Sequence, residues 1–140
     1  LRSGGRRATS GALASGYYLE PTILSDVATD AELSCTEVFG PVAAVYRAPD
    51  FDAALALANR SPYGLTACVH TRSFDRGIEF TRRVRAGVAV VNGGTFGSEP
   101  HMPFGGVGRS GNGSREPGTE ALDVYSELKD IYLLTHPPAL

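Results

Sequence analysis

Cysteine and histidine are scarce in this sequence, and those present are not arranged as metal ligands or as a catalytic group. The two cysteines, Cys35 and Cys68, have no CxxC motif or Cys/His cluster around them. This excludes the recognisable zinc and iron–sulfur spacings and gives no disulfide framework. His70, His101 and His136 show no triad-like or metal-like grouping either. We therefore predict no metal site, and reduced thiols in a cytoplasmic protein.

Long apolar runs and a strong charge of either sign are also missing. No run approaches the roughly 20 residues that span a bilayer, and the N-terminus has no hydrophobic signal core. The formal net charge of −2 gives no electrostatic footprint for nucleic acid or for an anionic membrane. The one basic cluster, Arg82, Arg83 and Arg85, is most simply the solvated face of a helix. We predict neither a membrane nor a nucleic-acid partner.

The residues that are present fit one folded domain. Of the 140 residues, 42% are hydrophobic and 20% are charged, which argues against disorder over most of the length. A compact chain of this size could bury roughly 68% of the surface that its unfolded form exposes. Because Leu1 stands where an initiator Met is usual, we expect the chain to have been cut from a longer one, although processing would also explain this residue.

The order of apolar patterns and turn residues predicts an α/β fold. Asp50 and Ser73 are good N-caps for helices over Phe51–Asn59 and Phe74–Arg85, and Gly87 serves as the C-terminal stop of the second helix. Two strand–helix–strand passes in succession imply a mainly parallel sheet with right-handed crossovers. Before the first helix we expect a strand remnant and mobile loop over 1–16, an extended segment over 17–24, a turn or short helix over 26–35 and a strand over 42–47. After it we expect a strand over 65–70, a strand buried on both faces over 88–91, a short helix over 119–124 and a strand-like tail over 125–134.

Glycine is abundant and unevenly placed. Nine of the 17 glycines lie between Gly93 and Gly118, which predicts one long loop, and long loops inside compact domains are usually functional. The run GGVGRSG within it is not a phosphate loop, because it lacks the P-loop pattern and does not lie between a strand and a long helix. Phe96 and Phe104 are the apolar groups best placed to line a channel beside this loop, and local anchoring in the core is the alternative role for each.

The run Glu37-Val38-Phe39-Gly40-Pro41-Val42 is the most informative stretch. An ionised carboxylate can accept hydrogen bonds from both hydroxyls of a vicinal diol such as a ribose, and these charge-assisted bonds are the stronger class. Phe39 could then pack against the sugar or a ring attached to it. The structural alternative is a surface Glu37 beside a core Phe39 at a turn.

Together with Pro103-Phe104-Gly105-Gly106-Val107-Gly108-Arg109-Ser110-Gly111, in this order and spacing, that run resembles the C-terminal part of an NAD(P)-dependent aldehyde dehydrogenase. The resemblance runs from about Gly16 to Leu134 and includes the family-typical pattern Ala58-Asn59-Arg60-Ser61-Pro62-Tyr63-Gly64-Leu65. It implies that Glu37 and Phe39 bind the cofactor, NAD or NADP. It also implies that Asn92, Gly93 and Phe104 border the catalytic centre and the tunnel for an aldehyde substrate, beside Phe96.

The same resemblance assigns Glu116 to a proton path or a cation site near the active centre. A carboxylate in such a loop is suited to a relay, and an ion pair with Arg109 or Arg115 is an equally simple explanation. This sequence departs from the family pattern here, because Gly108 stands where the family has Lys and one extra residue precedes the glutamate.

The family's nucleophilic cysteine and general-base glutamate lie upstream of these motifs, so the resemblance implies that this chain lacks both. Cys35 and Cys68 are not in the family's cysteine context, and neither has an evident activating group. For the complete enzyme, the resemblance implies a mechanism in which a cysteine thiolate attacks the aldehyde, hydride passes to the nicotinamide and the thioester is then hydrolysed. The pattern S-E-P-H-M-P-F-G-G with G-N-G-S-R-E looks closest to members that act on semialdehydes.

Two parts of such an enzyme are expected in this chain. Residues 1–124 resemble the C-terminal part of the catalytic domain, and residues 125–140 resemble the oligomerisation strand and tail, with Tyr125-Ser126-Glu127-Leu128-Lys129 matching the family's terminal strand. A homo-oligomer formed through 125–134 is implied. The competing hypothesis is a truncated, catalytically inactive module that self-associates through that strand, because an unpaired strand is a template for pairing with another chain.

Overall fold

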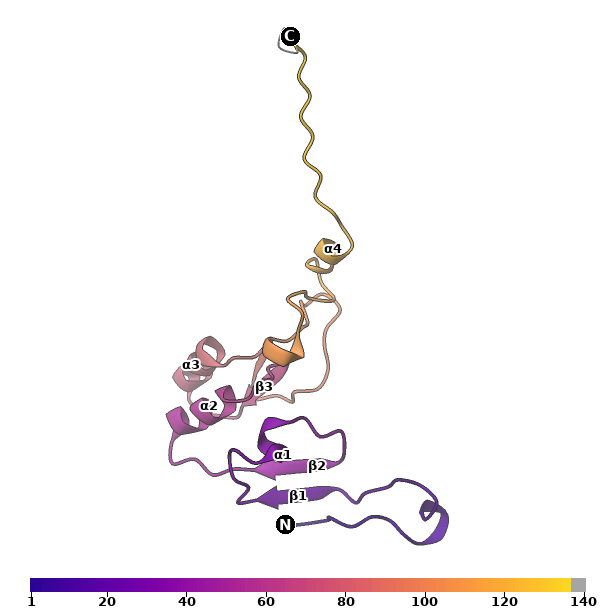
Figure 1. Ribbon diagram of the computed structural model, residues 1–140. Helices are drawn as coiled ribbons and strands as arrows, with labels where there is room; N and C mark the ends of the chain where they lie inside the picture. Colours follow the sequence, from indigo (N-terminus) through magenta and orange to yellow (C-terminus); the bar gives the residue numbers. More distant parts are fainter. Residues whose placement is uncertain (137–140) are drawn as a thin grey trace.

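The computed structural model describes residues 1–136, in which short strands and helices alternate as in an α/β protein (Figure 1). Strands β1 (Thr22–Ser25) and β2 (Val42–Val45) pair in parallel, with Thr22 opposite Val42. The short helix α1 (Glu32–Cys35) lies in the connection between them, within the expected turn or short helix. Before β1, the chain makes isolated antiparallel bridges and one 3-10 turn over Gly11–Leu13, where a strand remnant and a loop were predicted.

The second half of the fold is a strand–helix–strand unit. Strand β3 (Thr66–Val69) and strand β4 (Val88–Val91) pair in parallel, and helix α3 (Phe74–Arg83) connects them and contacts β4. Helix α2 (Phe51–Asn59) precedes this unit and lies beside α3 in Figure 1. The only later elements in the described chain are a 3-10 turn over Gly108–Ser110 and the short helix α4 (Ala121–Val124), which confirms the helix expected there.

Both predicted helix caps are confirmed. The Asp50 carboxylate accepts a hydrogen bond from the backbone N of Ala53 at 2.8 Å, and the Ser73 hydroxyl accepts one from Arg76 N at 3.3 Å. Helix α2 has the predicted bounds, whereas α3 ends at Arg83 rather than Arg85. The reason is that Val84 is extended, and the Arg85 N–H donates to the side chain of another segment instead of to a helical carbonyl.

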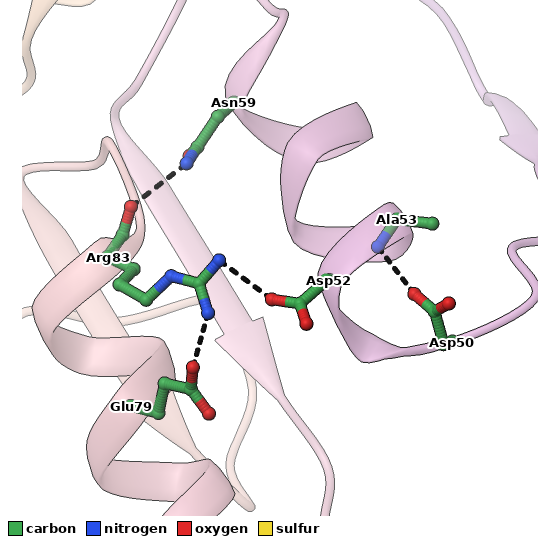
Figure 2. A network of polar contacts seen from close by, with 6 residues as sticks. All are labelled: Asp50, Asp52, Ala53, Asn59, Glu79 and Arg83. Atoms are coloured by element: carbon green, nitrogen blue, oxygen red, sulfur yellow. Dashed lines mark hydrogen bonds and ion pairs between the residues drawn. The ribbon is translucent and has the colours of Figure 1, made fainter.

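A polar network joins the two longer helices (Figure 2). The Arg83 guanidinium at the end of α3 lies 2.7 Å from the Asp52 carboxylate in the first turn of α2, and it also binds Glu79 one turn back on its own helix. The hydrogen bond to Asp52, followed by the one to Glu79, raises the pKa of Arg83 above its ordinary value. Asn59 adds a second link, because its amide donates to the Arg83 carbonyl at 2.9 Å. The register of α2 against α3 is therefore set by side-chain contacts at the C-terminal end of α3.

Two expectations about the sheet and the core are wrong for this chain. The parallel pairing is confirmed. However, β1–β2 and β3–β4 are two separate two-stranded sheets, and β3, which follows α2, does not pair with β1 or β2. Val88–Val91 is half-buried, with Val91 exposed; among the helices of the described chain, α3 is the one with the main contacts to this strand. Among the described residues, Leu55 and Phe80 are the only large hydrophobic side chains that are buried.

The C-terminal tail projects away from the rest of the chain (Figure 1). From Leu128 to Leu134 its large side chains are 68–105% exposed, and none of the described residues pairs with it as a strand. The alternative in which this tail docks on its own chain is therefore wrong. Its pairing with another chain stays a prediction.

Candidate active site

Glu37 lies in the turn between α1 and β2, with its side chain exposed to a surface cavity. The cavity has a volume of about 540 Å³. Cys35 and Thr36 line it beside Glu37, and Tyr63, Arg109 and Ser110 line it from segments far along the sequence. The carboxylate makes no ion pair with any residue of the described chain, so its two oxygens can accept hydrogen bonds from a bound molecule.

Phe39, the expected partner of Glu37, is 94% exposed and does not line this cavity. The Gly-Pro pair that follows leads directly into β2, since the Gly40 carbonyl accepts from Val42 N at 2.8 Å and the Pro41 carbonyl accepts from Thr22 N at 2.8 Å. Phe39 therefore lies just before β2, and no described residue packs over most of its side chain. The alternative of a Phe39 buried in the core is wrong for this chain.

The 3-10 turn over Gly108–Ser110, in the second half of the glycine loop, is docked on the segment between α2 and β3. Arg109 N donates to the Pro62 carbonyl at 2.9 Å, Val107 N donates to the Gly64 carbonyl at 3.0 Å, and Gly64 N donates to the Ser110 hydroxyl at 3.2 Å. These bonds bring Arg109 and Ser110 to the Glu37 cavity. Sequence reasoning noted both glycine-containing patterns but not their contact, because no local signal pairs residues about 45 positions apart.

Phe104 and Glu116 are brought together by the structure. Their backbones exchange two hydrogen bonds, Phe104 N to the Glu116 carbonyl at 3.1 Å and Glu116 N to the Phe104 carbonyl at 2.8 Å. Both line a second cavity of about 410 Å³, with Asn112, Ser114 and Val124. The Tyr125 hydroxyl donates to the Glu116 carboxylate at 3.2 Å.

The alternative ion pair of Glu116 with Arg109 or Arg115 is not formed within residues 1–136. Arg115 instead donates to the Ser114 carbonyl at 2.9 Å. The contact from Tyr125 was not expected, and its only sequence signal is the presence of a tyrosine just after a predicted short helix.

Asn92, Gly93 and Phe96 lie at the end of β4, away from both of these cavities. The Asn92 carboxamide pairs with the backbone of Thr71, accepting from its N–H at 2.8 Å and donating to its carbonyl at 2.9 Å. Phe96 is 89% exposed and its ring lies against Gly94. The structure therefore places the expected site residues in three regions: Glu37 at the first cavity with Phe39 just outside it, Phe104 with Glu116 at the second cavity, and Asn92, Gly93 and Phe96 in the segment after β4.

The two cysteines lie in different surroundings, and the described chain has neither a cluster of metal-ligating side chains nor a helix able to span a membrane. Cys35 is exposed beside Glu37, and its Sγ lies 3.8 Å from the Thr29 carbonyl, whereas Cys68 lies half-buried on β3. Among residues 1–136, no three Cys, His, Asp or Glu side chains gather as metal ligands would. None of the described helices combines the length and the apolar character that a membrane span requires.

Comparison with known proteins gives the family to which these motifs belong. The sequence model of the aldehyde dehydrogenase family matches residues 1–131. The chain belongs to the aldehyde dehydrogenase family. The resemblance seen in the Glu37 run and in the glycine loop is thereby confirmed. Both lie within the matched residues.

Similar aldehyde dehydrogenases of known sequence or structure show what share of their length this chain covers. It is 42% identical to the α-ketoglutarate semialdehyde dehydrogenase of Haloferax volcanii, and the match covers 94% of this chain and 28% of that protein. It is 36% identical to the NADP⁺ succinate-semialdehyde dehydrogenase of Mycobacterium leprae, and this match covers 95% of this chain and 28% of that protein. Among solved structures, it resembles a Mycobacterium tuberculosis aldehyde dehydrogenase complexed with NAD⁺. The TM-score is 0.83 and the identity 31%, and the match covers 99% of this chain and 28% of that one. The chain thus spans a little over a quarter of the length of the aldehyde dehydrogenases it matches.

Proposed function

We propose that this chain is the C-terminal portion of an enzyme that oxidises an aldehyde to a carboxylic acid with NAD or NADP. The observation that carries the proposal is the family match over residues 1–131. The α/β fold with parallel strand pairs supports it, since 99% of the chain superimposes on a family member of known structure. Within this portion we assign residues 1–124 to the catalytic domain and 125–140 to oligomerisation.

The residues around the first cavity fit a nicotinamide cofactor, whose bound form would supply the acceptor for hydride. A ribose offers two adjacent hydroxyl donors, and Glu37 offers two carboxylate oxygens without an ion-pair partner in the described chain. Phe39, exposed two residues further on, offers an aromatic face for the sugar or the ring. These two side chains bind and orient the cofactor, and the rest of the enzyme supplies the remainder of that site.

The residues after β4 are assigned to the substrate side of the site. Asn92 and Gly93 border the tunnel through their backbone, and Phe96 and Phe104 offer the apolar surface that an aldehyde chain requires. Glu116, hydrogen-bonded to Tyr125, is placed to hold or pass a proton near the reacting centre. Semialdehydes are the proposed substrate class, because the semialdehyde dehydrogenases of H. volcanii and M. leprae are both similar to this chain.

The proposal leaves the nucleophile and the general base to the remaining three quarters of the enzyme. We therefore expect the isolated chain to show no aldehyde-dependent reduction of NAD or NADP, measured by absorbance at the wavelength of the reduced nicotinamide. Cys35 is the last residue of α1, not at a helix N-terminus, and Cys68 lies on β3. No base of the described chain is hydrogen-bonded to either thiol, so neither has the activation that a nucleophile requires. Turnover that persists through purification and disappears in Cys35→Ser or Cys68→Ser would contradict this assignment.

The role of Glu37 is tested in the complete enzyme. Glu37→Gln keeps the shape of the side chain but removes the charge, so the loss expected is about 1–3 kcal/mol, as for a hydrogen bond to a charged group. It should appear in the cofactor dissociation constant or in the rate of hydride transfer. Glu20→Gln, at another exposed position, is the matched control and should change neither. If both quantities are also unchanged in Glu37→Gln, the residue is only structural.

A second candidate function is supported by the exposed tail. A truncated, inactive module could self-associate through residues 125–134, whose apolar side chains have no cover in this chain. The intact mass of the natively expressed protein separates the two candidates. A mass near 14.7 kDa favours the module, and a mass about three and a half times as large favours the enzyme.

A further inference from the structure

Asn92 holds an unusual backbone conformation where β4 ends and the glycine loop begins. Its φ is +57°, in the left-handed region that few residues other than glycine adopt, although asparagine is among those that tolerate it. Its own N–H still donates to the Val69 carbonyl at 2.8 Å and so continues the β3–β4 ladder. The chain therefore turns sharply at this one residue, directly before Gly93.

The side chain of Asn92 explains how this turn is held. Its oxygen accepts from Thr71 N at 2.8 Å, and its nitrogen donates to the Thr71 carbonyl at 2.9 Å. A carboxamide carries the same donor and acceptor as a peptide group, so it can replace the next strand residue as a partner for Thr71. Two bonds to one residue also fix the orientation of the carboxamide, which a single bond would leave free to rotate.

Thr71 in turn is connected to the start of helix α3. Its hydroxyl accepts from Ser73 N at 3.1 Å, and Ser73 is the residue that caps α3. The start of the glycine loop is thus tied through Asn92 and Thr71 to the N-terminus of a helix. Thr71, Ser73 and Asn92 also line one surface cavity of about 340 Å³ beside that helix.

We propose that Asn92 is a positioning residue, whose carboxamide clamps the end of β4 to Thr71 and so sets the direction in which Gly93 and Phe96 leave the sheet. In this arrangement the side chain acts on the backbone of its own chain, and it does not bind the aldehyde. The structural part of the inference stands alone, and its effect on catalysis rests on the proposed function.

Asn59 provides a matched control within the same chain. Its carboxamide also makes one bond as acceptor and one as donor to the backbone: it accepts from Arg85 N at 2.8 Å and donates to the Arg83 carbonyl at 2.9 Å. Figure 2 shows the bond to Arg83. That pair closes the C-terminal end of α3, whereas the Asn92 pair closes the start of the glycine loop. Loss of either pair should weaken the unit formed by β3, α3 and β4, but only loss of the Asn92 pair should move the loop.

The experiment compares Asn92→Gly, Asn92→Asp and Asn59→Gly in the complete enzyme. Glycine keeps the positive φ accessible and removes both side-chain bonds, so it isolates the clamp from backbone strain. Asp keeps the acceptor for Thr71 N but places a second oxygen against the Thr71 carbonyl. It is a milder variant in case Asn92→Gly does not fold. The readouts are hydrogen exchange at Thr71 and over 93–97, and kcat and KM for the aldehyde.

We expect Asn92→Gly to raise exchange at Thr71 and over 93–97 and to lower kcat by about tenfold or more, since small misplacements near the reacting centre have large effects on rate. Asn92→Asp should lie between this variant and the wild type, and Asn59→Gly should change neither kcat nor exchange over 93–97. Unchanged exchange in Asn92→Gly, or a rise in KM alone, would overturn the proposal. A wild-type enzyme without aldehyde-dependent NAD(P) reduction would instead refute the proposed function, and the exchange data would still test the clamp.

Discussion

At the scale of single residues, Gly87 shows how closely the backbone segments of this chain approach one another. A methyl group at this position would overlap the carbonyl oxygen of Gly105, and the Gly87 N–H donates to the Gly64 carbonyl at 3.0 Å. Its φ is not in the left-handed region, so the predicted role as a helix stop is wrong. Helix α3 has already ended at Arg83, and Gly87 is instead the point where the glycine loop lies against the start of β4.

This contact predicts the effect of a minimal substitution. Gly87→Ala must displace the backbone at Gly105, so we expect it to lower the stability of the complete enzyme by about 1–3 kcal/mol, as overpacked positions do. Thermal unfolding measures the change. Gly40→Ala is the control, because a methyl group there meets nothing within 4 Å and should shift stability by no more than about 0.5 kcal/mol. Equal shifts in the two variants would show that the Gly87 contact does not form.

The residues that could be predicted from the sequence are those whose partners are close along the chain. Asp50 and Ser73 cap helices through N–H groups three residues away, and the pattern around each predicts this bond. The carboxamides of Asn59 and Asn92 bind backbone groups 21–26 residues away, and neither has a local signal. The contact between Tyr125 and Glu116, which are nine positions apart, was missed because the irregular segment between them has no periodicity that would bring the two side chains together.

At the scale of elements, the helices and strands were predicted better than their pairing. Periodicity and caps locate α2 and α3, because both signals lie within the helix and its first turn. The division into two parallel pairs, with Thr22 opposite Val42 and Thr66 opposite Val88, depends on which strands meet in space. The run at 88–91 is apolar enough to be buried on both faces, yet in the described chain it is half-buried, with α3 as the helix that mainly contacts it. The composition of a strand indicates whether it can be buried, but its actual burial depends on which other segments pack against it.

At the scale of the whole molecule, the chain exposes far more surface than its mass predicts. Its accessible surface is 11,253 Å², whereas a compact monomer of 14.7 kDa would expose about 6,900 Å². The excess includes aromatic side chains such as Phe39, Phe74 and Phe96. Surface of this kind marks sites where other polypeptide packs. The observation agrees with the proposal that the chain works as one part of a larger enzyme, in which other segments cover both strand pairs.

The tail over 125–134 is the clearest part of that excess, and it supports a prediction about assembly. Its Leu128, Ile131, Tyr132, Leu133 and Leu134 side chains are each at least 68% exposed, and an extended segment offers unpaired N–H and C=O groups along its length. In a closed symmetric oligomer, every subunit would use this same segment. Deleting residues 125–140 should therefore lower the oligomeric state or cause aggregation, as measured by light scattering. Lys129→Gln, which changes the charge but leaves the backbone and the apolar groups in place, should assemble normally. An unchanged assembly after the deletion would mean that another surface joins the subunits, and the exposed tail would then need a different partner.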